Sequence, residues 1–285
     1  MIAEKQGYFA EQNLNVEFVT FTKLYEAITA LSQGQIDITA GVMDVAAFSA
    51  ISQGVQLKFV ADEGYVDPNA ACAYSTWIVK PDVLGDDFSK LKGRKVIFTK
   101  AGLLEYAFDL LLKKGGLTKN DITIMDVPIQ NRAEAVSSGQ ADIAQVGEPW
   151  VTRALDTGKV VSWMPWNSYM PGHQFGAVYF GPSIYNNKID IGKRFMVAYL
   201  KGIRDFNVGK NDSNIAAMAE LTKLDPAEVA KTCWQSFRND GSIDLPSVLS
   251  FQKWAVDSGY MDKLLNSEDI WDPQFVDYAN QVLGK

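Results

Sequence analysis

Short runs of apolar residues, some in strict alternation, and longer runs with apolar positions every three or four residues succeed each other along the first two-thirds of the chain. The short runs predict strands and the longer ones predict amphipathic helices. The expected strands are 16–21, 36–40, 57–61, 73–79, 95–99, 122–127, 142–146 and 174–181. The expected helices are 23–33, 44–53, 103–115, 129–138 and 149–157. Alternation at this spacing is typical of doubly wound α/β sheets covered by helices on both faces.

From about residue 182 the pattern becomes helical. Apolar residues recur at spacings of three and four over residues 190–209, and Asp225 followed by Pro226 is typical of a helix start. Two further helices are expected at 245–258 and 273–283. These helices need an apolar surface to cover, and we expect them to pack on the sheet of the first lobe.

A stretch of nine residues occurs twice in the chain. Residues 30–38 return as residues 135–143, with six of the nine positions identical. In each copy a helix ends at a glycine, Gly34 or Gly139, which adopts the left-handed helix cap without a steric penalty. A short apolar strand follows directly. Two copies of half a parallel αβ unit predict two similar lobes with a cleft between them.

The strands expected at 73–79 and 174–181 bracket the second copy of the repeat. If each of them passes from one lobe to the other, lobe one comprises residues 1–79 plus 181–285 and lobe two comprises residues 80–180, joined by a two-strand hinge. Lobe one begins with a helix instead of the strand that usually opens such a lobe. We attribute this to truncation of the chain or to a late start.

Composition and charge exclude several classes of protein. The 285 residues are 47% hydrophobic, which is enough for sizeable cores, and the net charge of −7 without a basic run argues against a nucleic-acid partner. No apolar run approaches the length of a membrane span, and the first residues do not resemble a signal peptide. We interpret Cys72 and Cys233 as two buried free thiols, with a disulfide as the alternative.

Counting residue types argues against catalysis and metal binding. The single histidine, His173, lies in a turn-like Pro-Gly-His run, and there is no CxxC pair, nucleophile elbow, phosphate-binding loop or dinucleotide fingerprint. We therefore expect no catalytic residue, no metal and no cofactor.

Binding signals lie where strands lead into helices, because ligands of α/β sheets bind beyond the carboxyl ends of the strands. Four such junctions occur, at 41–44, 62–65, 100–103 and 147–150. Their carboxylates outnumber one lysine, and aromatic residues lie nearby, which favours a ligand with an amine, an amidine or an aromatic ring. The residues expected to contact the ligand are Gly41, Asp44, Asp62, Glu63, Trp77, Lys100, Gly102, Tyr106, Glu148 and Trp150.

Two of these carboxylates have a structural alternative. Asp44 and Glu148 stand at helix starts, where acidic residues commonly cap the first turn. For Asp44 capping is the first interpretation, and for Glu148 capping and ligand contact are both open. The junctions 41–44 and 147–150 follow the two copies of the repeat, so we expect them to face each other across the cleft.

Several segments together carry a family resemblance. They are residues 3–17 with the turn 34–37, residues 91–96, residues 139–142 with the Glu-Pro-Trp run 148–150, residues 194–200 and residues 271–283. These segments resemble the solute-binding proteins of ABC importers, in the branch that includes nitrate-, aliphatic sulfonate-, taurine- and thiamine-pyrimidine-precursor-binding proteins. The resemblance spans nearly the whole chain.

The resemblance implies a two-lobed periplasmic-binding-protein fold, type II-like, that closes on a small polar nutrient and presents it to an ABC permease in the membrane. It also implies a monomer that works in the periplasm or tethered to the outer face of a membrane, and not an enzyme. Closure of a hinge by a ligand that contacts both lobes is the expected mechanism.

The same resemblance bears on the ligand. In the family, the strand-to-helix loop of lobe two often carries hydroxyl groups that hold an anion, whereas here it reads Gly102-Leu103-Leu104-Glu105. This departure favours an aminopyrimidine thiamine precursor, with Glu148 accepting from the ring amine and Trp150 or Trp77 stacking on the ring. Taurine, an alkyl sulfonate or nitrate is the alternative ligand. An enzyme on the same fold that acts on a pyrimidine or a small amine is the alternative of another class.

Overall fold

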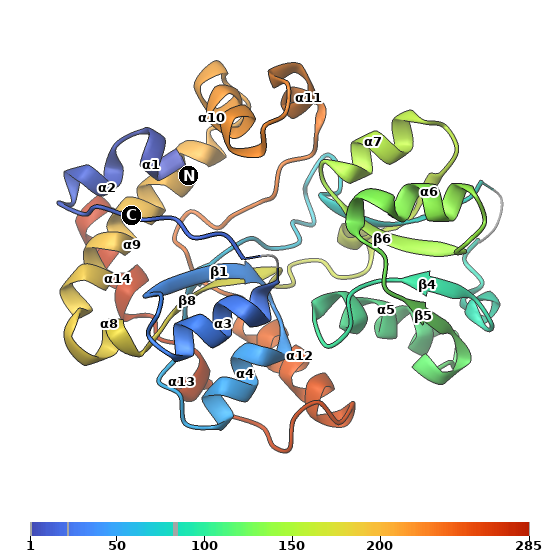
Figure 1. Ribbon diagram of the computed structural model, residues 1–285, viewed down its shortest axis with the longest axis horizontal. Helices are drawn as coiled ribbons and strands as arrows, with labels where there is room; N and C mark the ends of the chain where they lie inside the picture. The colour runs from blue at the N-terminus through green and yellow to red at the C-terminus, as the bar shows by residue number, and fades with distance from the viewer. Residues whose placement is uncertain (1, 22, 82–84, 285) are drawn as a thin grey trace. The chain divides into compact units, whose positions relative to one another are not determined.

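The computed structural model describes residues 2–21, 23–81 and 85–284, and it divides the chain into two compact units (Figure 1). Unit 1 comprises Met1–Tyr65, His173–Ala230 and Ser236–Lys285, and unit 2 comprises Val66–Gly172 and Lys231–Gln235. The chain therefore changes unit four times. The short return to unit 2 over 231–235 was not among the boundaries predicted from the sequence.

Unit 1 is built on a three-stranded sheet in the order β1-β8-β2. These strands are β1 (Ile38–Val42), β8 (Gly176–Phe180) and β2 (Lys58–Asp62), and β8 runs antiparallel to both neighbours. Val42 lies opposite Gly176, and Asp62 lies opposite Ala177. The ends of β1 and β2 and the start of β8 therefore share one edge of the sheet.

Eleven helices belong wholly or mainly to unit 1. They are α1 (Ile2–Lys5), α2 (Tyr8–Glu11), α3 (Leu24–Ser32), α4 (Val45–Ser52), α8 (Pro182–Asn187), α9 (Ile189–Asn207), α10 (Asp212–Thr222), α11 (Pro226–Lys231), α12 (Leu245–Asp257), α13 (Ser267–Ile270) and α14 (Gln274–Leu283). Figure 1 shows α9 and α14 side by side, and these two helices share a core with β2 and β8.

The sheet of unit 1 is apolar on both faces because successive side chains of a strand point in opposite directions. On one face, Tyr179 packs edge-on against Phe59, and Phe59 packs against Phe48 of α4. On the other face, Phe180 of β8 packs against Phe275 of α14. All five side chains are fully buried. The C-terminal helices therefore pack on the sheet of lobe one, as the pattern predicted.

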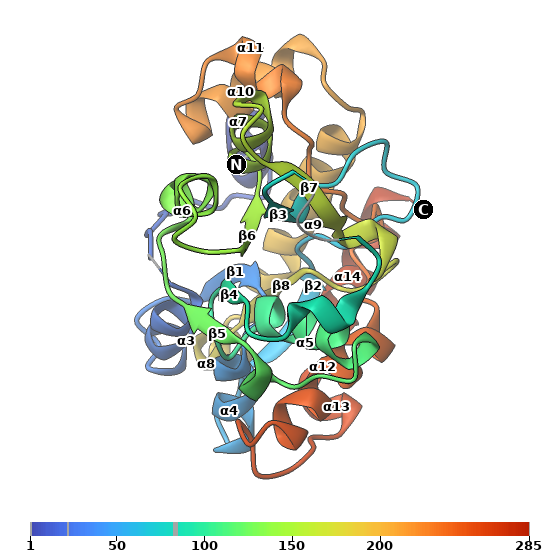
Figure 2. The same cartoon turned by 90° about the vertical axis from the view of Figure 1, so that its right-hand side faces the viewer.

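Unit 2 is built on a five-stranded sheet in the order β5-β4-β6-β3-β7 (Figure 2). The strands are β3 (Ser75–Val79), β4 (Lys95–Ile97), β5 (Thr123–Met125), β6 (Ile143–Gly147) and β7 (Val161–Pro165). β4 runs parallel to β5 and β6, whereas β3 runs antiparallel to β6 and β7.

Three α-helices cover the sheet of unit 2, namely α5 (Leu103–Lys114), α6 (Arg132–Ser137) and α7 (Trp150–Asp156). Val136 of α6 and Val151 of α7 share a buried cluster with Ile78 of β3. Phe108 of α5 packs against Trp77, the neighbour of Ile78, with ring centroids 4.6 Å apart. Because adjacent strand residues point to opposite faces, α5 lies on one side of the sheet and α6 and α7 on the other.

The repeat behaves as predicted. Gly34 and Gly139 both adopt positive φ, at 70° and 85°, and each ends a helix that leads into a strand, β1 or β6. A methyl group at such an angle would clash with the backbone, so the two glycines fix the same turn in both units.

Three expectations about strands are corrected. Residues 16–21 form no strand, and Phe18 within them is 54% exposed. The strand 161–165 was missed because its first residues are exposed. The sheets are also less regularly parallel than predicted, because β3 and β8 run antiparallel to their neighbours. The chain changes unit before each of these two strands instead of along it.

One further fact concerns membranes. Over the ranges of the chain described above, none of the helices combines the length and the apolar character needed to cross a bilayer.

Candidate functional site

The strand ends of unit 1 bring three loops to one sheet edge. Gly41 lies in β1 shortly before this edge, Glu63 follows β2, and Gly176 begins β8. A Cβ on Gly176 would lie 2.6 Å from Glu63 Oε2 and 2.6 Å from the Gly41 carbonyl oxygen. Glycine is therefore required at position 176, and its missing side chain is what lets the Glu63 carboxylate lie against the strand.

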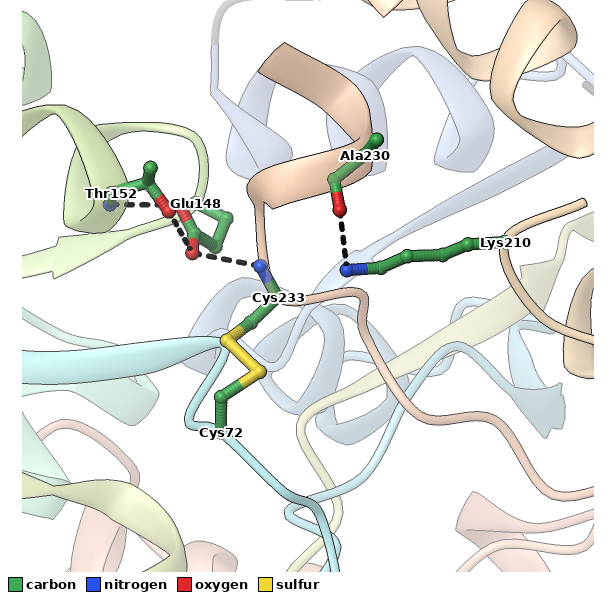
Figure 3. Close-up of a disulfide and its surroundings, with 6 residues drawn as sticks. All are labelled: Cys72, Glu148, Thr152, Lys210, Ala230 and Cys233. Carbon is green, nitrogen blue, oxygen red and sulfur yellow. Dashed lines mark hydrogen bonds between the residues drawn. A yellow bond between two sulfur atoms is a disulfide. The ribbon is translucent and has the colours of Figure 1, made fainter. Parts of the chain in front are cut away.

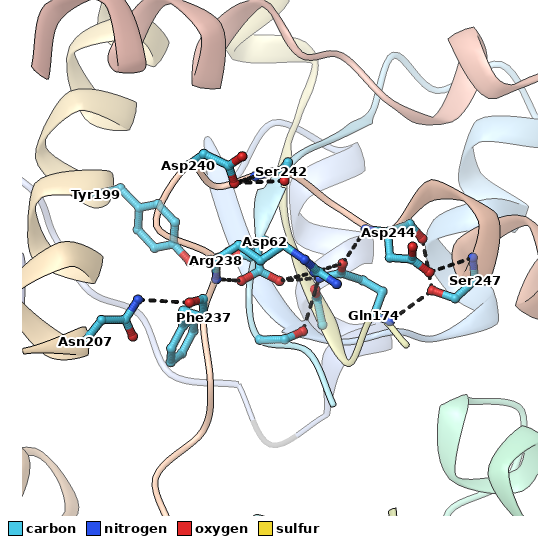
Figure 4. A network of polar contacts seen from close by, with 12 residues as sticks. Asp62, Gln174, Tyr199, Asn207, Phe237, Arg238, Asp240, Ser242, Asp244 and Ser247 are labelled. Carbon is cyan, nitrogen blue, oxygen red and sulfur yellow. Dashed lines mark hydrogen bonds and ion pairs between the residues drawn. The ribbon is translucent and has the colours of Figure 1, made fainter. Parts of the chain in front are cut away.

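Asp62 is fully buried at this edge and fully engaged in hydrogen bonds (Figure 4). Its Oδ2 accepts from the backbone N–H of Arg238 at 2.8 Å, and its Oδ1 accepts from Gln174 Nε2 at 2.5 Å and from the Arg238 guanidinium at 3.3 Å. Burial raises the pKa of Asp62 to about 6, although the hydrogen bonds from Arg238 and Gln174 favour the charged form. Asp62 therefore anchors the loop that carries Arg238.

Gln174 extends this network to the start of α12. Its Oε1 accepts from the Arg238 guanidinium and from the backbone N–H of Asp244, both at 2.8 Å, and its backbone N–H donates to Ser247 Oγ. The Arg238 guanidinium also lies 4.2 Å from the ring centroid of Tyr65. Every functional group of this network has a partner within unit 1, so we assign it a structural role.

Glu63 differs sharply from its neighbour Asp62. Its backbone N–H donates to the Gly176 carbonyl at 3.1 Å, but no donor or cation from the described residues reaches its carboxylate. Burial, together with the nearby charge of Asp62, raises the pKa of Glu63 to about 8. A desolvated carboxylate without a partner at a sheet edge is typical of a functional site.

Asp44 and Tyr179 lie near Glu63. Asp44 caps α4 by accepting from the backbone N–H of Ala46 at 2.8 Å, so the capping interpretation is right for this residue. Burial raises the pKa of Asp44. The Tyr179 hydroxyl is buried and makes no hydrogen bond within the described ranges, and its pKa is raised by burial and by the charges of Asp44 and Glu63.

In unit 2 the Glu148 carboxylate is engaged on both oxygens (Figure 3). Its Oε2 accepts from the backbone N–H of Thr152, and its Oε1 accepts from the Thr152 hydroxyl at 2.8 Å and from the backbone N–H of Cys233 at 2.9 Å. Glu148 thus caps α7 and also holds the segment 231–235. Of the two interpretations left open by the sequence, capping is the one that these contacts favour.

Cys72 and Cys233 form a disulfide, which corrects the interpretation of two buried free thiols (Figure 3). The two residues are 161 positions apart in the sequence, and Cys72 is exposed. Sequence reasoning missed the pair because nothing in the pattern showed that residues 231–235 return to the unit that contains Cys72. The disulfide fastens that short segment to unit 2.

The remaining predicted residues of unit 2 have varied surroundings. Trp77 is fully buried in the core and donates from its indole N–H to the Tyr169 hydroxyl at 2.7 Å, so its ring is committed to packing. Tyr106 is also buried, Gly102 caps the start of α5, Lys100 is exposed, and Trp150 is half-buried.

The loop before α5 is closed from within. Glu105 is buried, and its Oε2 accepts from the backbone N–H of Ala101 at 2.8 Å. Ala101 adopts a positive φ of 58°, which is uncommon outside glycine. The carboxylate that the sequence placed in this loop therefore stabilises the turn, and the Lys119 ammonium lies 4.0 Å from its other oxygen.

A buried arginine that the sequence did not bring to notice lies at the strand ends of unit 2. The Arg132 guanidinium donates to the carbonyl oxygens of Val127 and Gln145, to Gln145 Oε1 and, at 3.4 Å, to the Thr99 hydroxyl. It makes no ion pair with a carboxylate of the described chain, and burial lowers its pKa. Arg132 therefore joins the ends of β4, β5 and β6 and leaves its positive charge without a counter-ion there.

Four residues that the sequence analysis did not name thus shape these edges, namely Tyr179, Gln174, Arg238 and Arg132. An arginine within the apolar stripe of the helix at 129–138 was a usable signal for Arg132. The other three are brought to the edge by segments more than one hundred positions from β2 along the chain, so no local pattern could have placed them.

Metal ligation was also considered. The described part of the chain contains no group of three or more histidine, cysteine, aspartate or glutamate side chains that could hold a metal ion.

Comparisons with known proteins agree on one class. The family model described as "NMT1/THI5 like" matches residues 1–207. No curated protein sequence matches the chain significantly.

Solved structures with a similar fold cover almost the whole chain. The ligand-binding component of an ABC-type import system from Staphylococcus aureus, solved with zinc bound, has a TM-score of 0.78 and 14% identity, over 98% of this chain and 93% of that one. The aliphatic sulphonate-binding protein SsuA from Escherichia coli has a TM-score of 0.76 and 16% identity, over 96% and 88% of the chains. The nitrate-binding protein NrtA from Synechocystis PCC 6803 has values of 0.77 and 14%, over 99% and 85%. The predicted fold class, a two-lobed periplasmic-binding-protein fold, is confirmed.

Proposed function

The chain belongs to the NMT1/THI5-like family, and from this premise we propose that it is the solute-binding component of an ABC import system. The observation that carries the proposal is that each unit ends its strands in loops where a buried charged group lacks a counter-ion. Glu63 is that group in unit 1, and Arg132 is that group in unit 2. Folding alone does not account for such groups, because a buried charge without an opposite charge destabilises the protein.

We propose the following assignment of the predicted site residues. Gly41, Asp44 and Glu63 of unit 1 and Lys100, Gly102 and Trp150 of unit 2 contact the solute. Asp62, Trp77, Tyr106 and Glu148 support these contacts from within, since they are buried or fully hydrogen-bonded. Trp150 is the aromatic residue best suited to stack on a flat ring because it is half-buried, whereas Trp77 is enclosed.

The solute is a small polar nutrient with hydrogen-bond donors, and an aminopyrimidine precursor of thiamine is the favoured example. Carboxylates accept only, so Asp44 and Glu63 select a molecule with N–H groups. Glu148 is no longer the favoured acceptor of the ring amine, because both of its oxygens already accept hydrogen bonds.

Arg132 favours a second class of solute, an oxyanion such as taurine, an alkyl sulfonate or nitrate. Its charge is buried at the strand ends without a carboxylate partner, and one N–H of Nη2 is left without a partner in the described part of the chain. A guanidinium is well suited to oxyanions because its planar fork matches their geometry.

The disulfide bears on the compartment. Disulfides form and persist in oxidising surroundings such as the periplasm or the cell exterior. The pair Cys72–Cys233 therefore supports a protein that acts in the periplasm or on the outer face of a membrane, as a monomer that delivers its solute to an ABC permease. We propose a transport role and no catalytic activity, and an enzyme on the same fold is the competing class.

Calorimetric titration against a panel tests the function. The panel contains aminopyrimidines, taurine, alkyl sulfonates, nitrate and small primary amines. Stoichiometric binding of one panel member, with that member recovered unchanged after incubation, is the expected result. Recovery of a chemically altered product would make the protein an enzyme, and absence of binding to every member would refute the transport role.

Variants then test the site in unit 2. Trp150→Ala is expected to weaken binding of the identified solute at least about tenfold if the ring is stacked. Trp163→Ala is the matched control, because Trp163 is a half-buried tryptophan of the same unit whose indole N–H donates to the Gly85 carbonyl. Equal affinity of wild type and Trp150→Ala would remove Trp150 from the site.

A further inference from the structure

We propose that the solute is an organic cation whose positively charged nitrogen is bound in unit 1 by the carboxylates of Glu63 and Asp44 and by the hydroxyl of Tyr179. This inference rests on the proposed function and narrows its solute class to ammonium or amidinium compounds.

The Glu63 carboxylate is the first ground for the inference. It lies against the start of β8, where the absent side chain of Gly176 makes room for it. Its neighbour Asp62 is negatively charged or shares that charge with Arg238, so Glu63 gains no stabilisation from the adjacent network. A carboxylate in this position is stabilised by a cation that the described chain does not supply.

Tyr179 is the second and independent ground. Its side chain is fully buried, and its ring is held against Phe59 with centroids 4.7 Å apart. Its hydroxyl has no hydrogen-bond partner within the described ranges and lies in the electrostatic field of both Asp44 and Glu63. Leaving a buried hydroxyl unpaired costs about 1–3 kcal/mol, and a nitrogen donor would satisfy its oxygen.

The charges around the three groups favour a cation over a neutral solute. Asp44, Asp62 and Glu63 carry three potential negative charges, and the facing cation is Arg238. Arg238 is already engaged with Asp62, Gln174 and the ring of Tyr65. The Tyr199 hydroxyl on α9 is likewise engaged, since it donates to the Asp62 carbonyl at 2.7 Å.

The same geometry favours nitrogen over a metal ion. Calcium and magnesium need six or more oxygen ligands, and no group of three carboxylate, imidazole or thiolate side chains converges anywhere in the described chain. Two carboxylates and one hydroxyl suit the three N–H donors of an ammonium group or the planar donors of an amidinium.

The test is calorimetry at pH 8.5 with matched pairs of probes. One pair is 4-amino-5-aminomethyl-2-methylpyrimidine and its 5-hydroxymethyl analogue, and further pairs are primary amines or amidines and the alcohols or amides of the same shape. The cationic member is expected to bind at least about tenfold more tightly than its neutral analogue, as is typical of a charged hydrogen-bonded contact.

Variants assign the effect to the named residues. Glu63→Gln is expected to lower affinity for the cationic probe at least about tenfold and for the neutral one less than about threefold. Tyr179→Phe, which keeps the ring contact with Phe59, is expected to lower it about threefold to tenfold. Glu17→Gln, an exposed site of the same unit, is the matched control and leaves affinity unchanged. Thermal unfolding of each variant verifies that it is folded.

The outcomes separate this inference from the proposed function. If only neutral or anionic members of the solute panel bind with one-to-one stoichiometry, the transport role stands and the cation site is refuted. Equal affinities within each matched pair, or a Glu63→Gln variant that binds the cation as tightly as wild type, would refute it as well. If no panel member binds at all, the proposed function itself fails.

Discussion

Asp62 and Arg238, which are 176 positions apart in the sequence, are joined by a backbone-to-carboxylate hydrogen bond of 2.8 Å and a guanidinium contact of 3.3 Å. This pair attaches the loop after residue 235 to the sheet edge of unit 1. It also separates two adjacent carboxylates by role, because Asp62 receives donors from Arg238 and Gln174 whereas Glu63 receives none from the described residues. One carboxylate stabilises the fold, and the other is available to a solute.

Arg238→Ala is expected to destabilise the protein by about 2–4 kcal/mol, because it leaves the Asp62 carboxylate buried without its cation. The free energy of unfolding in urea is the measurement. Lys253→Ala removes an exposed ion pair with Asp257 on α12 and serves as the control, with an expected change below about 0.5 kcal/mol. Equal losses in both variants would show that the buried network adds nothing beyond a surface contact.

The stability of the protein is expected to fall as pH rises through the range set by Glu63. The pKa of Glu63 is about 8 in the folded protein and 4.5 in its absence of structure, so the folded state holds a proton that the unfolded state has lost between these values. Its stabilising contribution is complete below about pH 4.5 and is lost as pH passes 8. Asp62 acts in the same direction, up to about pH 6.

Glu63→Gln is expected to remove most of this dependence and to be more stable than wild type at pH 9, by on the order of 2 kcal/mol, because the glutamine stays neutral. Urea unfolding of both proteins at pH 5, 7 and 9 measures it. A wild-type curve that is flat or rises from pH 5 to 9 would contradict the assignment, and Glu17→Gln controls for the loss of a surface charge.

Replacing Cys233 by serine is expected to lower the free energy of unfolding by about 2–5 kcal/mol, since the disulfide closes a long loop in the unfolded chain. Cys72→Ser should give the same loss, and the double variant should lose no more than either single one. Alkylation of the unfolded wild-type protein without reductant is the direct check, because two modified thiols would show that the pair is not bonded.

Arg132→Met is expected to destabilise the protein by about 2–4 kcal/mol, because the carbonyls of Val127 and Gln145 lose buried donors. Arg94→Met is the control in the same unit. Arg94 pairs with Asp142 at 3.1 Å near the surface, so its loss should cost about 1 kcal/mol or less. A near-neutral Arg132→Met variant would mean that the strand ends are held by other contacts.

The local features of the fold were predictable because they depend on neighbours in the sequence. Gly34 and Gly139 cap helices, Asp44 caps α4, and the run beginning at Asp225 and Pro226 starts a helix, each through contacts within a few residues. Strand positions such as 58–62 and 143–147 follow from short apolar runs of the right length. Glu63 was placed at the end of a strand for the same reason.

The prediction failed where a property depends on distant segments. Glu148 reads as a ligand residue in sequence, yet Thr152 and the backbone of Cys233 occupy its oxygens. Trp77 reads as a stacking platform, yet α5 encloses it. The disulfide was judged from two isolated cysteines, because the return of residues 231–235 to unit 2 leaves no trace in hydrophobic periodicity.

The sequence by itself therefore determined the α/β class, the two repeated helix–glycine–strand turns and the acidic strand ends, because these follow from hydrophobic periodicity and backbone preference over a few residues. Only the tertiary structure decided which carboxylate is free. Arg238 and Gln174 reach Asp62 from segments more than one hundred positions away, and hydrogen bonds between such segments exist only once the chain has folded.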